Sequence, residues 1–151
     1  METQDNGREY RLMRNRLSTS LAMLILLLTG QAYADTPVLT AACPRPEAIE
    51  QTATDNGYVY QASIPGMGYW MGENPETQKP YKVAFDSASY KDSTQAIICD
   101  YLGDGDAAIR LTLKGVQNWK PSPDTDWKDG FCQSREANRC GFEYSAVTGA
   151  Q

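Results

Sequence analysis

The chain has 151 residues with 14 basic and 19 acidic side chains, a net charge of −5, and no histidine. The negative balance disfavours nucleic acids and anionic membrane surfaces as partners, because phosphate binding needs clustered cations. The missing histidine excludes Ser-His and Cys-His nucleophile pairs, together with the commonest general base and metal ligand.

Residues 1–34 have the order of regions that is typical of a secretory signal peptide. A lead with four arginines precedes the apolar run Leu21–Leu28, and Ala32-Tyr33-Ala34 offers the small-x-small pattern that signal peptidase cuts after. We therefore expect cleavage between Ala34 and Asp35. The exported protein would be bacterial, periplasmic or secreted, and free of the membrane.

Three alternatives to this processing remain. Translation that starts at Met13 would give a shorter signal peptide. The uncharged run Leu17–Ala34 is near the lower length limit for an uncleaved membrane anchor. Lipidation of Cys43 is disfavoured, because the residue three positions before it is Thr40 and the apolar run ends well upstream.

Residues 35–42 are predicted to be a flexible lead-in, and residues 43–151 a single β-rich domain. All four cysteines lie in the exported part, where an even number indicates two disulfides. Three pairings are open. We favour Cys132–Cys140, which closes a short loop, and Cys43–Cys99, which ties the amino-terminal segment to a central strand.

The first half of the domain is expected to combine one short helix with two strands. Pro46–Gln51 can start a helix, with proline and an acid in its first turn. Asp55–Gly57 is a turn signal, and the aromatic and β-branched run Tyr58–Ile64 predicts a strand. After a Pro/Gly break, Tyr69–Met71 predicts a short strand that ends at Gly72.

The second half contains the clearest strand patterns. Tyr81–Asp86 alternates, Thr94–Leu102 and Ala107–Leu113 flank the turn Gly103–Asp106, and Gly141–Tyr144 predicts a last strand. The polar run 87–93 would be a connection or an edge, and 118–130 a long loop. The sequence thus predicts a mainly β protein: a small antiparallel sheet, sandwich or open barrel, stapled by disulfides and carrying a short N-terminal helix.

Motifs for chemistry are mostly absent. There is no GxSxG, P-loop or GxGxxG, so no catalytic, cofactor-binding or metal residue is predicted, and no cofactor is expected. The loop Asp124–Gly130 has three carboxylates, which are ligands that calcium prefers. It does not match a calcium-binding EF-hand loop, because Lys128 occupies the fifth position, where an acid is needed. A pair of carboxylates acting as a hydrolase remains an alternative.

Four aromatic residues are candidate contacts for a partner: Tyr69, Trp70, Trp119 and Trp127. Tyr69 and Trp70 lie in a segment flanked by glycine and proline, and the other two bracket an acidic loop. Exposed Trp and Tyr are common anchors for proteins and sugars, since they bury a large area at low entropic cost. We favour the alternative that each tryptophan fills the core beneath a loop, because the domain has just three phenylalanines.

Short motifs resemble a family of small exported bacterial proteins of unknown function. They are Cys43-Pro44 near the start of the domain, the centre Gly68-Tyr69-Trp70-Met71-Gly72, and the strand Ile98-Cys99-Asp100-Tyr101. The resemblance covers about residues 43 to 115. It implies a compact exported domain and supplies no catalytic residues.

The leading hypothesis is an exported, non-enzymatic binding module that recognises another protein, with a basic partner favoured by the acidic surface. One version resembles the small acidic inhibitors that bacteria export against basic host lysozymes, although their S-G-x-x-Y loop is not present in this chain. A carbohydrate- or cell-wall-binding domain that stacks Trp70, Trp119 or Trp127 on sugar rings is the second hypothesis. The carboxylate-pair hydrolase is the third.

Overall fold

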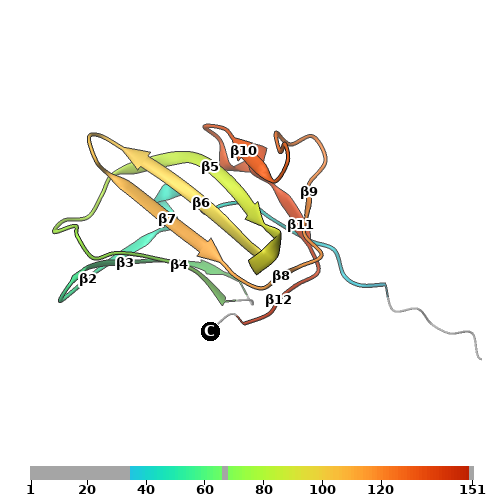
Figure 1. Ribbon diagram of the computed structural model, residues 1–151, viewed down its shortest axis with the longest axis horizontal. Helices are drawn as coiled ribbons and strands as arrows, with labels where there is room; N and C mark the ends of the chain where they lie inside the picture. Colours follow the sequence, from blue (N-terminus) through green and yellow to red (C-terminus); the bar gives the residue numbers. More distant parts are fainter. Residues whose placement is uncertain (1–34, 66–67, 150–151) are drawn as a thin grey trace, which may run out of the picture. The chain divides into compact units, whose positions relative to one another are not determined.

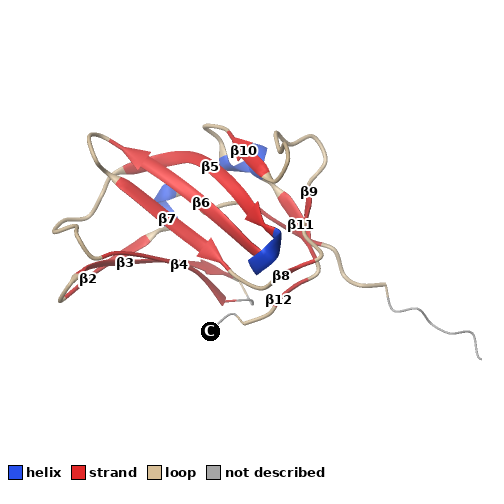
Figure 2. Ribbon diagram, viewed as in Figure 1, coloured by secondary structure: helices blue, strands red, loops and turns tan. Residues whose placement is uncertain are grey.

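The computed structural model describes residues 35–65 and 68–149, and the chain from Thr36 onward forms one compact unit built almost entirely of strands (Figure 1; Figure 2). The predicted signal peptide lies outside the described residues. The strands are β1 (Leu39–Ala41), β2 (Glu50–Thr54), β3 (Gly57–Ile64), β4 (Gly68–Asn74), β5 (Val83–Lys91), β6 (Ala96–Gly103), β7 (Ala108–Leu113), β8 (Val116–Gln117), β9 (Lys120–Pro121), β10 (Phe131–Gln133), β11 (Phe142–Tyr144) and β12 (Ala146–Val147).

Seven of these strands form one antiparallel sheet in the order β10-β5-β6-β7-β4-β3-β2. Its first and last strands do not pair with each other, so the sheet is open rather than a closed barrel. The predicted hairpin between β6 and β7 is confirmed, with Leu102 opposite Ala108 at its tip. The expectation of a mainly β, antiparallel fold is therefore correct.

Alternation along the strands gives the large sheet an inner face that lines the core. Tyr60, Trp70 and Leu111 are among the buried residues of this face, while their neighbours in sequence point outward. A β-bulge shifts the register between Phe85 and Ser87 in β5. The extra residue keeps both Phe85 and Ala88 on the inner face, opposite Tyr101 and Cys99, which simple alternation would not allow.

Two small sheets accompany the large one: β1-β11-β9 and β12-β8. The first packs against the inner face, because the rings of Trp70 on β4 and Phe142 on β11 meet edge to face with centroids 6.4 Å apart. Phe142 and Tyr144 are buried in the same core cluster. The core thus lies between the large sheet and β11.

Both disulfides have the pairing favoured from the sequence, Cys43–Cys99 and Cys132–Cys140. They indicate an oxidising, extracytoplasmic environment. Because the sulfur of Cys43 is bonded to Cys99, it offers no thiol for lipidation in this structure. Within residues 35–65 and 68–149, no helix has the length and apolarity needed to cross a bilayer.

Two predictions near the amino end are wrong. The expected helix is a single 3₁₀ turn, Pro46–Ala48, and the chain enters β2 at Glu50 because this polar segment pairs with β3. The lead-in 35–42 is not flexible throughout. Its residues Leu39–Ala41 form β1 and pair with β11.

Two strands are also longer than predicted. β4 does not end at Gly72 but continues to Asn74, because its residues pair with β3 as far as Tyr58. β5 extends through the polar run to Lys91, since β6 lies on one side of it and β10 on the other. Pairing with neighbouring strands therefore overrides the local glycine and serine signals.

Candidate functional site

Large apolar side chains are exposed on the outer face of the seven-stranded sheet. Tyr69 and Met71 flank the buried Trp70 on β4 and are 44% and 45% exposed. Leu102 on β6 and Phe131 on β10 are also exposed, and each precedes or follows a buried residue of its strand. Tyr69 and Met71 lie together on one face of β4, whereas Leu102 and Phe131 are exposed singly on other strands, as is common at protein surfaces.

The outer face is interrupted at the seam between β4 and β7. These strands share the single register pair Met71–Thr112, whereas β3 and β4 pair over seven positions and β6 and β7 over six. On one side of that pair the strands press together, because a Cβ atom on Gly72 would lie 2.0 Å from the carbonyl oxygen of Arg110. On the other side, no register pair joins Tyr69 and Lys114. The seam is thus a wedge that is closed at Gly72 and open at Tyr69.

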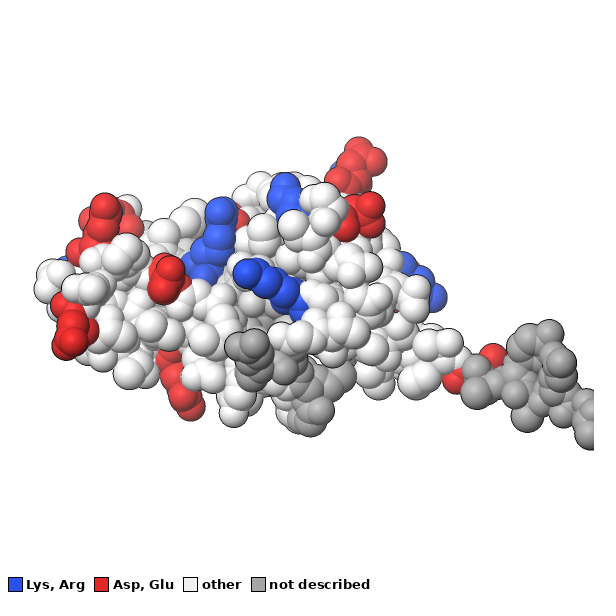
Figure 3. All heavy atoms as spheres, turned by 60° about the horizontal axis from the view of Figure 1, so that its bottom comes forward, with Lys and Arg blue, Asp and Glu red and all other residues white. Residues whose placement is uncertain are grey.

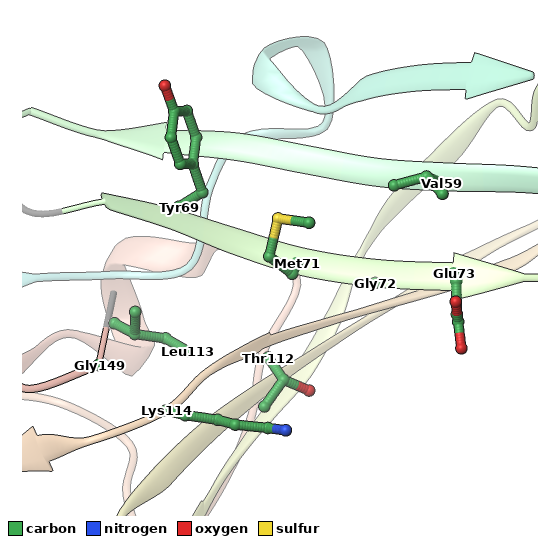
Figure 4. Close-up of a pocket in the computed structure, with 9 residues that line it drawn as sticks. All are labelled: Val59, Tyr69, Met71, Gly72, Glu73, Thr112, Leu113, Lys114 and Gly149. Atoms are coloured by element: carbon green, nitrogen blue, oxygen red, sulfur yellow. The ribbon is translucent and has the colours of Figure 1, made fainter. Parts of the chain in front are cut away.

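A groove of about 690 Å³ extends over this wedge and past Gly72 to Val59 and Glu73, and we call it the seam groove. Figure 4 shows its lining residues, which belong to β3, β4 and β7, except that Lys114 follows β7 and Gly149 follows β12. They are Val59, Tyr69, Met71, Gly72, Glu73, Thr112, Leu113, Lys114 and Gly149. The exposed apolar surface of Tyr69 and Met71 forms one wall. The groove can therefore bury apolar groups of a partner between two strands.

Charge is placed at both ends of the seam groove. Lys114 follows β7 at the open end, and Glu73 lies near the closed end. Neither side chain belongs to an ion pair with any residue that the structure describes. Arg110, which the register places beside Glu73, instead holds Asp100 through two hydrogen bonds of 2.7 and 3.0 Å. Lys114 and Glu73 are thus available to charged groups of a partner.

Acidic residues gather where the turns of the large sheet lie, beyond Glu73. Asp55 belongs to the β2–β3 turn, Glu76 to the loop after β4, and Asp104 and Asp106 to the β6–β7 turn. Antiparallel pairing brings these connections to one end of the sheet, and Figure 3 shows acidic spheres there. Two lysines of the β4–β5 loop offset them in part. We call this region the acidic end.

The structure separates the four predicted contact residues. Tyr69 lies in the seam groove, as an exposed contact residue should. Trp70 points the opposite way and is 2% exposed, so it fills the core, as the favoured alternative predicts, and it is not a surface contact. Met71 was missed, although alternation along β4 places it on the same face as Tyr69. Lys114 could not be recognised, because its place depends on pairing between distant segments.

Trp119 and Trp127, which bracket the acidic loop in the sequence, are half-buried, and their rings pack together. Trp119 stacks on Tyr90 at 4.2 Å with nearly parallel rings, and Trp127 meets Trp119 edge to face at 5.1 Å. The indole N–H of Trp127 donates to the carbonyl of Gly141 at 2.9 Å. Because Tyr90 covers one ring face of Trp119, that face is not open to a partner.

The side chain of Arg139 holds the acidic loop before β10 in place. The guanidinium of Arg139 donates to both carboxylate oxygens of Asp126, at 3.0 and 2.5 Å, and to the carbonyl of Asp124 at 3.1 Å. Hydrogen bonding from Arg139 lowers the pKa of Asp126, the opposite of what a general acid needs. Among the described residues, no three His, Cys, Asp or Glu side chains gather as metal ligands.

The chain was also compared with known proteins. No protein-family model, curated protein or solved structure matches it. The function of the chain therefore has to follow from the geometry of the seam groove and the acidic end. The groove combines exposed apolar side chains with two separated charged residues, and such surfaces can bind another molecule.

Proposed function

We propose that the protein is an exported, non-enzymatic binding module that recognises another protein through the seam groove. The observation that carries this proposal is the pair Tyr69 and Met71, both about half-exposed on one wall of a groove between two strands. Partly exposed aromatic and methionine side chains are enriched at protein interfaces, because they bury much area at little entropic cost. The partner covers this wall and excludes water from it.

The acidic end supports a basic partner. The exported part, from Asp35 onward, has ten basic and sixteen acidic residues, a net charge of −6. A field of this sign accelerates the approach of a cationic protein, and salt screens it. Export is part of the proposal: the signal peptide is removed after Ala34, and the protein acts in the periplasm or outside the cell.

Photo-crosslinking tests the groove. A photoreactive phenylalanine analogue replaces Met71 in the full-length protein, and adducts formed in its native host are identified by mass spectrometry. The matched control carries the analogue in place of Phe131, which is 47% exposed on the far edge of the same sheet. We expect one protein adduct from position 71 that is absent from position 131. Equal adducts at the two positions, or none at position 71, would overturn the proposal.

Two further measurements test charge and export. The association rate of the captured partner should fall as salt shortens the Debye length from about 10 Å at 0.1 M to about 3 Å at 1 M. A salt-independent rate would contradict the basic partner. The amino terminus of the exported protein should be Asp35, and a terminus that retains the first 34 residues would contradict cleavage.

A further inference from the structure

Two exposed side chains of opposite charge lie at the two ends of the seam groove. Glu73 follows Met71 by two residues on β4, and Lys114 follows Thr112 by two residues just after β7. Because the strands are antiparallel and pair at Met71–Thr112, the two charges lie on opposite sides of that pair, as Figure 4 shows. Neither charge has an ion-pair partner among the described residues. The groove therefore has a negative end and a positive end about one centre.

A surface with this arrangement is complementary to itself. A two-fold axis can lie between two facing grooves, close to the Met71–Thr112 pair. It brings Glu73 of each copy over Lys114 of the other. Both unpaired charges of both copies then find a partner at once, because each residue pair occurs twice in a two-fold contact. Facing sheets lie about 10 Å apart, which leaves room for the side chains of Tyr69 and Met71 from both copies to pack between them.

The acidic end favours this antiparallel orientation of the two grooves. It lies beyond Glu73 in each copy, so the pairing of Glu73 with Lys114 places the two acidic ends at opposite ends of the dimer. With the grooves parallel, the acidic ends would lie side by side and their like charges would repel. The orientation that pairs the free charges is therefore also the one that keeps the acidic turns apart.

The contact area limits how tight such a dimer can be. The seam groove spans three of the seven strands, β3, β4 and β7, whereas stable complexes bury about 800 Å² on each partner. Interfaces below this size are typical of transient complexes. We therefore expect a weak, reversible dimer, which still removes the exposed surface of Tyr69 and Met71 from water.

From this geometry we propose that a second copy of the chain covers the seam groove in a face-to-face, two-fold dimer, with Glu73 of each copy paired with Lys114 of the other. The dimer uses the surface that the proposed function gives to another protein, so the second copy and that protein exclude each other. This competition rests on the proposed function, whereas the dimer itself rests on the groove. Self-association keeps the apolar wall of the groove covered until the other protein binds.

Sedimentation equilibrium of the exported protein tests the dimer. At low salt we expect a monomer–dimer equilibrium with a Kd between about 10 μM and about 1 mM, as suits a small, transient contact. Glu73→Lys and Lys114→Glu should each weaken the dimer at least about tenfold, because each places like charges opposite each other at both ends of the contact. Lys128→Glu is the matched control. It makes the same charge change on an exposed residue outside the groove and should change the Kd by less than about twofold.

A mixture of the two groove variants separates specific pairing from the effect of overall charge. In a dimer of Glu73→Lys with Lys114→Glu, each end of the contact again joins opposite charges. An equimolar mixture should therefore form heterodimers with a Kd within about threefold of the wild-type value. Overall charge predicts another order. Glu73→Lys changes the net charge of the exported part from −6 to −4, since a cation replaces an anion, and would by charge alone dimerise more tightly than wild type.

Three results would overturn the dimer: a wild-type protein that stays monomeric up to about 1 mM, a dimer that neither charge change weakens, or a mixture that associates no better than the separate variants. The competition has its own test. Addition of the protein captured by crosslinking should release monomers, and a dimer that persists with that protein bound would overturn mutual exclusion.

The photo-crosslinker at position 71 distinguishes the failure of this inference from failure of the proposed function. Position 71 lies near the two-fold axis, so the dimer adds an adduct between two copies of the chain, which mass spectrometry separates from an adduct with another protein. An adduct with another protein from a chain that stays monomeric would support the proposed function and overturn the dimer. An adduct between two copies alone would support the dimer and overturn the proposed function.

Discussion

The side-chain amide of Gln51 pairs with the backbone of Tyr81 through two hydrogen bonds. Its N–H donates to the carbonyl of Tyr81 at 2.7 Å, and its oxygen accepts from the N–H of Tyr81 at 2.8 Å. The two residues are 30 positions apart, so a side chain provides here the donor and acceptor that a neighbouring strand would provide. Gln51 thereby fixes the segment before β5 against the edge strand β2.

Replacing Gln51 by leucine should therefore destabilise the fold. The change leaves two partly buried backbone groups of Tyr81 without partners, and we expect the free energy of unfolding in urea to fall by about 1–3 kcal/mol. Gln61→Leu is the matched control, because Gln61 is also half-buried but its side chain bonds to no described residue. Equal losses for the two variants would contradict the role given to Gln51.

Gly72→Ala should open the closed end of the seam. The new methyl group would overlap the backbone of Arg110, and overpacking of this kind costs about 1–3 kcal/mol in the free energy of unfolding. Hydrogen exchange should also quicken at Met71 and Thr112. Gly105→Ala provides a comparison, because its φ is +67° but nothing lies within 4 Å of the added atom. Wild-type stability of Gly72→Ala would show that the strands do not touch there.

The two disulfides should contribute unequally to stability. The chain-entropy relation gives about 4.2 kcal/mol for the loop closed by Cys43–Cys99 and about 2.6 kcal/mol for that of Cys132–Cys140. All four cysteines are buried, so replacing both cysteines of either disulfide by alanine removes a comparable amount of buried side chain. We expect the variant that lacks Cys43–Cys99 to unfold at the lower urea concentration, and the reverse order would contradict the entropic account.

Alkaline pH should weaken the fold through Tyr101. Its hydroxyl donates to the carbonyl of Pro44 at 2.7 Å, and burial, with a smaller effect of Asp100, raises its pKa well above the usual value. A raised tyrosine pKa means stability that is complete below the unfolded pKa of about 10 and is lost as the pH rises above it.

Urea unfolding between about pH 8 and pH 11 measures this loss. Tyr101→Phe should be less stable than wild type at pH 8 and should depend less on pH above about 10. Tyr69→Phe is the control, because it removes a hydroxyl from a side chain that is 44% exposed on the outer face. If Tyr101→Phe kept the full wild-type slope, other groups would be responsible for the alkaline loss.

Local patterns in the sequence were sufficient for the strongest part of the fold. The β6–β7 hairpin could be predicted because two apolar, alternating runs flank a Gly/Asp turn. The pairing of Cys132 with Cys140 followed from their short separation. β2 could not be predicted, since Glu50–Thr54 has no apolar alternation and becomes a strand only by pairing with β3.

The candidate site was predictable only in part. Tyr69, Trp70 and Met71 are all apolar or aromatic, so alternation alone does not say which of them faces the core. Pairing decides this: Trp70 lies opposite the buried Ala62, and its neighbours on both sides therefore face outward. The groove itself depends on how β4 meets β7, two strands whose only register pair is 41 residues apart.

The Cys43–Cys99 bond also determines how the domain bears mechanical load. Tension on the amino-terminal end can peel the three residues of β1 from β11, but it then reaches a covalent link to β6. Because β6 lies between β5 and β7, further pulling must shear two ladders at once instead of unzipping an edge. A folded, oxidised domain pulled from its amino end would therefore lose only β1 before the sheet resists as a whole.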